Sequence, residues 1–197
     1  MTIERAVLER NRAVGILALL DGTVLMATDL VVSDTLSQDS DGRDGDAVII
    51  LGGASAEIAR ARMLDNRGYA IRAFGTDTTV AAADIVVERT AEQACVVDTC
   101  SHAPGGLGLA SEGGGTLDVR RFRSANNALV GVLVASGSEL DLHEGVVSGN
   151  RIGANIQIDG FDRARLQDRV IYVDNGVNTD TTQFELPEPP DVNLEHP

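Results

Sequence analysis

The densest group of carboxylates in the chain is the stretch 39–46. It combines four aspartates with two glycines: Asp39, Asp41, Gly42, Asp44, Gly45 and Asp46. Clustered carboxylates on a turning backbone are what a hard cation such as Ca²⁺ requires. The spacing departs from an EF-hand loop, because Arg43 stands at the fifth position and no Glu stands at the twelfth. The stretch therefore predicts either a calcium site, with these four aspartates as ligands, or a solvated acidic loop.

A second group combines Cys95 and Cys100 with Asp98 and His102. A Cys-x4-Cys pair in one loop is compatible with a short disulfide, a redox pair or part of a metal site. Two cysteines and one histidine are fewer than the four ligands of a structural zinc site. A catalytic Cys–His dyad is a further alternative, although no oxyanion-hole motif accompanies it. In a secreted protein, the preferred interpretation is a disulfide between Cys95 and Cys100.

A third group surrounds His143, with Glu139, Asp141 and Glu144 close by in the sequence. Because Leu142 continues an apolar alternation, Asp141 and His143 are expected to face outward side by side. The group is either a functional cluster or a set of ordinary exposed polar side chains.

Four more carboxylates are expected to stack near one edge of the fold: Asp29, Asp34, Asp84 and Glu88. A glycoside hydrolase needs two carboxyl groups about 5 to 10 Å apart, which neighbouring strands are able to supply. A pectate-lyase-like site would need carboxylates for calcium and a nearby Arg or Lys as base. No known signature joins these residues, so we assign no catalytic residue and no cofactor apart from the candidate Ca²⁺.

The elements that position these groups repeat. An apolar alternation begins at Leu117, is followed by turns, and begins again at Leu140, 23 residues later. Such a period, built from short alternations separated by Gly and Asn, is typical of stacked coils in an all-β solenoid. The expected strands are about three residues long. The inward positions that this pattern predicts are Ile16, Ile58, Ile71, Val119, Val132, Val134, Leu142, Ile156, Ile158 and Leu166.

Each coil has a corner where an asparagine precedes a glycine and an apolar strand. The blocks begin at Asn11, Asn66, Asn127 and Asn150, with a weaker copy at Asn175. Asparagine tolerates a left-handed backbone, and equivalent asparagines in successive coils are expected to bond to each other. These blocks resemble the right-handed parallel β-helix repeats of the pectin-lyase-like superfamily. The resemblance implies a single-stranded right-handed parallel β-helix of about seven rungs, in a bacterial extracellular or cell-surface protein.

The predicted β-helix covers residues 1–178, and residues 179–197 form a Pro-rich acidic tail, either a linker or a strap over the last rung. The chain begins within a coil, so we expect it to be a piece of a longer protein whose missing part holds a signal peptide and a cap. Two insertions, 33–46 and 90–106, leave the same corner of the second and fourth coils. They are expected to touch or to frame a shallow groove over the third coil.

Composition limits the partners. The formal net charge is −14 and aromatic residues make up 3% of the chain. An acidic surface repels phosphates, which argues against nucleic acid and anionic lipid as partners. No apolar run approaches the roughly twenty residues of a membrane-spanning helix. The remaining partners are a neutral polysaccharide, another protein, or a second copy that associates end to end.

The sequence is compatible with three functions. The first is a non-catalytic β-helix segment that acts as a rigid spacer or an adhesion or binding scaffold. The second is a polysaccharide lyase or glycoside hydrolase with its site at the insertion edge. The third is a scaffold unit that self-associates end to end. A convergent set of carboxylates with a nearby Arg would favour the enzyme.

Overall fold

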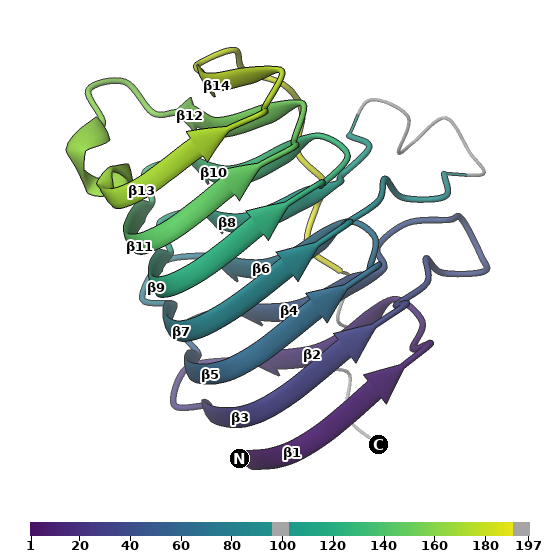
Figure 1. Cartoon of the computed structure of the whole chain (residues 1–197). Helices are drawn as coiled ribbons and strands as arrows, with labels where there is room; N and C mark the ends of the chain where they lie inside the picture. The colour runs from purple at the N-terminus through teal and green to yellow at the C-terminus, as the bar shows by residue number, and fades with distance from the viewer. Residues whose placement is uncertain (96–102, 191–197) are drawn as a thin grey trace.

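The chain coils between two parallel sheets. The computed structural model describes residues 1–95 and 103–190, and these contain fourteen strands in two seven-stranded sheets. Each coil gives one strand to each sheet, and every strand pairs in parallel with the equivalent strand of the next coil (Figure 1). The only helix in the described part of the chain is the 3₁₀ turn Arg163–Leu166. The prediction of an all-β stack of about seven coils is therefore confirmed.

The sheets differ in strand length, and we call them the long-strand sheet and the short-strand sheet. The long-strand sheet contains β1 (Thr2–Glu9), β3 (Val24–Ser33), β5 (Ser55–Leu64), β7 (Thr79–Glu88), β9 (Thr116–Ala125), β11 (Glu139–Ser148) and β13 (Asp168–Val173). The short-strand sheet contains β2 (Val14–Leu19), β4 (Asp46–Leu51), β6 (Tyr69–Phe74), β8 (Leu107–Glu112), β10 (Val130–Ala135), β12 (Ile152–Gln157) and β14 (Val177–Asp180).

The expectation of three-residue strands is wrong, because the long strands pass through a bend without ending. One residue within each strand of the long-strand sheet has a positive φ, between 50° and 59°; it lies near the middle of the strand except in β13, where it is the second of six residues. In chain order these residues are Arg5, Asp29, Arg60, Asp84, Arg121, Glu144 and Arg169. Their charges alternate strictly along the stack, and we call them the charge ladder. Three of its pairs are in contact, at 2.6 Å for Arg60–Asp29, 2.7 Å for Arg121–Asp84 and 2.6 Å for Arg169–Glu144.

The core fills the space between the two sheets. Nine of the ten residues predicted to point inward are buried there, and Ile158 packs against them with partial exposure. Aliphatic side chains from each coil contact those of the next, so one continuous core runs the length of the stack.

A column of asparagines lies at the corner after the long strands. The side-chain oxygen of Asn150 accepts hydrogen bonds from the backbone and side-chain nitrogens of Asn127, at 2.9 and 3.0 Å, and Asn175 does the same for Asn150. The predicted bonding between coils is confirmed. The expectation that these asparagines have a left-handed backbone is wrong. The left-handed residue is the one before the asparagine, for example Asn126 or Asp174.

The two insertions leave the same corner, after β3 and after β7, and they contact each other. The backbone N–H of Ala94 donates to Ser37 Oγ at 3.1 Å, and that of Asp44 donates to Gln93 Oε1. Cys95 N–H donates to the carbonyl of Gly42 at 3.0 Å. The prediction that the insertions touch is confirmed.

The segment after β14 turns back along the stack. It follows the outer face of the short-strand sheet (Figure 1), and its carbonyl at Pro187 accepts a bond from Arg72 of β6 at 2.8 Å. The segment is a strap across several coils, whereas the sequence suggested a strap over the last coil alone. Within the described residues, no helix is long and apolar enough to cross a membrane.

Candidate functional site

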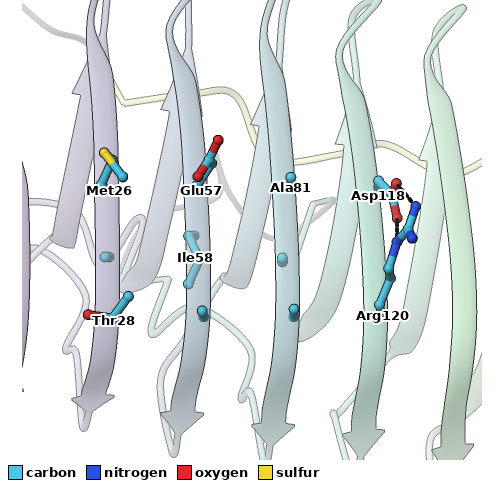
Figure 2. A pocket seen from close by; sticks show the side chains of 11 residues that line it. Met26, Thr28, Glu57, Ile58, Ala81, Asp118 and Arg120 are labelled. Carbon is cyan, nitrogen blue, oxygen red and sulfur yellow. Dashed lines mark hydrogen bonds and ion pairs between the residues drawn. The ribbon is translucent and has the colours of Figure 1, made fainter.

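The outer face of the long-strand sheet carries a shallow groove. Strand β7 presents only small side chains outward there, those of Thr79, Ala81 and Ala83. Larger side chains stand on both sides, Glu57 on β5 and Asp118 on β9 (Figure 2). Two adjoining hollows, of about 340 and 270 Å³, share this floor. We call the feature the alanine groove.

Strand register explains how the groove arises. Glu57, Ala81 and Asp118 are direct neighbours across β5, β7 and β9, and Met26 precedes them on β3. Because neighbouring strands lie about 4.8 Å apart, the backbones of Glu57 and Asp118 are separated by roughly 9.6 Å. The missing side-chain volume at Ala81 leaves the space between the two carboxylates open.

The two walls of the groove differ in their electrostatics. Arg120 contacts Asp118 at 3.0 Å along the same strand, and this hydrogen bond raises the pKa of Arg120. Glu57 forms no ion pair or hydrogen bond with the described residues and is exposed. One wall is therefore a neutralised pair, and the other is a free carboxylate.

A polar cluster continues from the groove onto β11 and β13. His143 Nδ1 lies 2.7 Å from Asp168 Oδ2, and its Nε2 lies 3.8 Å from Asp118. Arg165 contacts Asp141 at 2.6 Å and Glu139 at 3.2 Å. Hydrogen bonding to His143 lowers the pKa of Asp168, and hydrogen bonding to Arg165 lowers that of Asp141.

Sequence reasoning found part of this cluster. Asp141 and His143 face outward together as expected, and Glu139 joins them through Arg165. Glu144 does not, because it sits in the charge ladder and contacts Arg169. Asp118, Arg120, Asp168 and Glu57 were missed. The 23-residue repeat carries the signal for two of them, since it places Asp118 beside Asp141 and Arg120 beside His143.

Comparison of the chain with family models, curated proteins and solved structures found no match. The function of the site is therefore inferred from the geometry and the chemistry of its residues.

The carboxylates expected to stack near the insertion edge do not converge. Asp29 and Asp84 belong to alternate steps of the charge ladder, and each is bonded to an arginine of the next coil. Glu88 contacts Arg89 at 2.9 Å and Arg123 at 3.0 Å. These three carboxylates are thus neutralised by neighbours, whereas Asp34 is exposed and forms no ion pair with the described residues.

The four aspartates of the acidic loop take different partners. Asp39 is exposed and contacts Arg12 at 2.6 Å, while Asp41 accepts a bond from the backbone of Arg43. Asp44 is buried beside Gln38, and Asp46 is buried and accepts a 2.6 Å bond from the Tyr69 N–H. Residues 1–95 and 103–190 contain no group of three or more His, Cys, Asp or Glu placed to hold a metal. Calcium binding by this loop stays a prediction.

The proposed disulfide also stays a prediction. Cys100, Asp98 and His102 lie outside the described residues, and the Cys95–Cys100 bridge and the Cys–His dyad lie outside them as well.

Proposed function

We propose that this chain is a right-handed parallel β-helix that acts as a non-catalytic binding scaffold, with the alanine groove as its ligand site. The observation that carries the proposal is the outward face of β7, where Thr79, Ala81 and Ala83 leave a hollow between Glu57 and Asp118. The stack around this hollow is regular and continuously cored, as a rigid scaffold requires. The assignment to the pectin-lyase-like superfamily, and with it an extracellular or cell-surface location, rests on the resemblance of the repeats.

The chemistry of the groove favours a neutral polysaccharide. Hydroxyl groups of Thr28, Ser55, Thr79 and Thr116 line its edges and offer hydrogen bonds to sugar hydroxyls. Glu57 and the net charge of −14 repel a polyanion. The floor from Thr79 to Ala83 spans roughly 13 Å, at about 3.3 Å per residue, which accommodates a short stretch of an elongated chain.

A binding assay tests the scaffold. The wild-type protein is titrated with a panel of neutral polysaccharides, and the Ala81→Arg variant is titrated in parallel. The bulky side chain should fill the groove and lower the affinity about tenfold or more. Val86→Glu is the matched control, because Val86 lies outward on the same strand beyond the bend at Asp84 and stands between Arg62 and Arg123, so that it too places a charge between two charges of the opposite sign. Equal affinities of both variants and wild type would reject the groove as the site.

A glycoside hydrolase is the second candidate, supported by the placement of Glu57 and Asp118. Inverting enzymes hold their two carboxyl groups roughly 6.5 to 9.5 Å apart, and the two-strand separation approaches this range. Release of reducing ends from a bound polysaccharide by wild type, and its loss in Glu57→Gln, would replace the scaffold with the enzyme. Binding without release would retain the scaffold.

A further inference from the structure

The outer face of the short-strand sheet is apolar and is buried within the monomer. Its cluster contains seven buried residues: Tyr69, Leu107, Ala110, Val130, Leu133, Ala135 and Ile152. Phe184 and Leu186 of the strap pack against this cluster. The strap therefore occupies a groove that is distinct from the alanine groove, on the other sheet.

Polar contacts fix the position of the strap along the groove. Asn155 of β12 donates to the carbonyl of Thr182 at 3.1 Å, and Arg72 of β6 donates to that of Pro187 at 2.8 Å. Farther along, Arg43 contacts Glu188 at 3.4 Å. The yellow segment in Figure 1 follows this path across the strands. The groove thus recognises an extended segment with two apolar side chains, a proline and an acidic residue.

Arg72 forms a buried ion pair beneath the strap, so removal of the strap is expected to destabilise this face of the sheet. The Arg72 side chain is 1% exposed and pairs with Glu112 at 2.9 Å, and its guanidinium carbon lies 4.3 Å from the centre of the Tyr69 ring and 4.8 Å from that of the Phe74 ring. The Tyr69 hydroxyl, two Arg72 nitrogens and Glu112 Oε1 are buried and have no partner among the described residues. A strap that leaves would expose an apolar sheet face around this ion pair, so the groove requires an occupant.

We propose that this face is a peptide-docking groove and that the strap of a second copy of this chain docks in it by reciprocal exchange. The contacts that hold the strap involve residues 182–188 and do not depend on which chain supplies them. The connection to β14 is the turn at Thr181, whose side chain is exposed; Asp180 Oδ1 accepts bonds there from the N–H groups of Thr181 and Thr182 at 2.7 and 3.1 Å, so the turn is held by local contacts that travel with either end of the strap. Reciprocal exchange between two copies would supply the same strap residues to both grooves and would close as a symmetric dimer.

A peptide-binding experiment tests the groove in the full-length chain. The double variant Phe184→Ser, Leu186→Ser is designed to release its own strap. A fluorescent peptide of residues 181–190 should bind this variant saturably, and it should bind wild type about tenfold or more weakly, because the strap in cis competes at an effective concentration of roughly millimolar. A control peptide with Ser at positions 184 and 186 should not bind. If the variant keeps its β circular-dichroism spectrum and binds neither peptide, or binds both equally, the proposal is wrong.

An exchange experiment tests the occupant with wild-type protein and so remains decisive if the double variant fails to fold. Two wild-type preparations of different isotopic mass are mixed at roughly millimolar concentration, warmed to loosen the strap, and cooled. Native mass spectrometry should then detect mixed dimers, and Leu186→Ser should reduce their yield severalfold. Monomers alone after this treatment, or dimers that Leu186→Ser leaves unchanged, would overturn strap exchange.

Discussion

At the scale of single residues, the asparagine column has two interruptions. Thr35 and Thr90 replace asparagine in the second and fourth coils, which are the coils that carry the insertions. Each backbone N–H donates to the asparagine of the next coil, Asn66 and Asn127 respectively, but both threonine hydroxyls are buried and have no partner within residues 1–95 and 103–190. The threonine side chain is too short to accept a bond from the coil below, so the column is broken twice.

Thr90→Asn should repair one interruption. The new side-chain oxygen is placed to accept a bond from the Asn66 N–H, as Asn150 accepts from Asn127, and a net gain of about 1 kcal/mol in the free energy of unfolding is expected. Denaturant titration measures the gain. Thr90→Val is the control, because it removes the unpartnered hydroxyl without supplying an acceptor. If Thr90→Val raises the free energy of unfolding as much as Thr90→Asn does, the gain comes from removing the buried hydroxyl and not from completing the asparagine column.

Asp46 is the second residue whose environment has a measurable consequence. Its burial raises the pKa of the carboxyl to about 8, while the positive charge of Arg72 opposes this change. A carboxyl whose pKa is higher in the folded than in the unfolded chain stabilises the fold at low pH. That stabilisation is lost as the pH rises from about 4 through about 8.

Asp46→Asn should remove this dependence. The asparagine keeps an acceptor for the Tyr69 N–H but carries no charge at any pH. Its free energy of unfolding, relative to wild type, should therefore be higher at about pH 9 than at about pH 5. Asp21→Asn, in an exposed turn, should show no such change and serves as the control. A relative stability of Asp46→Asn that falls with pH would contradict the prediction.

At the scale of elements, the outward faces of the long strands are held by charge pairs between coils. Arg60 illustrates this, because it bonds to Asp29 on one side and attracts Asp84 on the other. The hydrogen bond with Arg60 lowers the pKa of Asp29. All three side chains are exposed, so their interaction depends on salt.

Arg60→Glu places three acidic side chains in consecutive coils. The melting temperature should fall at low ionic strength, and the loss should shrink as added salt screens the repulsion. Arg60→Gln, which removes the pair without adding repulsion, should lose less and depend less on salt. Thermal denaturation followed by circular dichroism measures both variants. If the melting temperature falls by the same amount at all salt concentrations, the cause is the altered residue at the backbone bend and not charge repulsion.

The acidic loop remains the element in which calcium binding is predicted. Asp39 and Asp41 are the accessible members, whereas Asp44 and Asp46 are buried within the protein. Calorimetric titration with Ca²⁺ should give heat for wild type and less heat for the Asp39→Asn, Asp41→Asn variant, which spares the buried pair. Equal heats from the two proteins would show that the loop does not bind Ca²⁺. The absence of heat at roughly millimolar Ca²⁺ would show the same, because even weak extracellular calcium modules bind at that concentration.

At the scale of the whole molecule, the repeating coils could be predicted from the sequence. The specific partners of side chains in different coils could not, because they depend on how the strands are aligned. The coils and their inward residues follow from a local period of two within a longer repeat. Pairing of outward-facing arginines such as Arg60 with carboxylates of other coils follows from the sequence, but the strict alternation of the charge ladder was not predicted, since the insertions make its spacing irregular. Asp29 and Arg60 are 31 residues apart, and Asp84 and Arg121 are 37 apart. The strap groove was missed because only Phe184 and Leu186 mark the segment that fills it, and their target lies far away in the sequence.

Stacked coils contact only their neighbours, so stability should vary along the stack. In the part of the chain that the structure describes, β1 pairs with β3 alone and β13 with β11 alone, whereas β5, β7 and β9 are paired on both sides. Amide hydrogen exchange should be fastest in β1 and β13 and slowest in the three central strands. Mass spectrometry of deuterated peptides measures this profile. Uniform exchange across all long strands would indicate that the stack opens as one cooperative unit.

The charge ladder has an odd number of steps, and this parity bears on end-to-end assembly. It starts with Arg5 and finishes with Arg169, so both outer steps have the same sign. A second copy stacked head to tail would set Arg169 of one chain against Arg5 of the other. The ladder therefore opposes a homopolymeric fibre. A coil with an acidic residue at this position is, in contrast, electrostatically matched to either end.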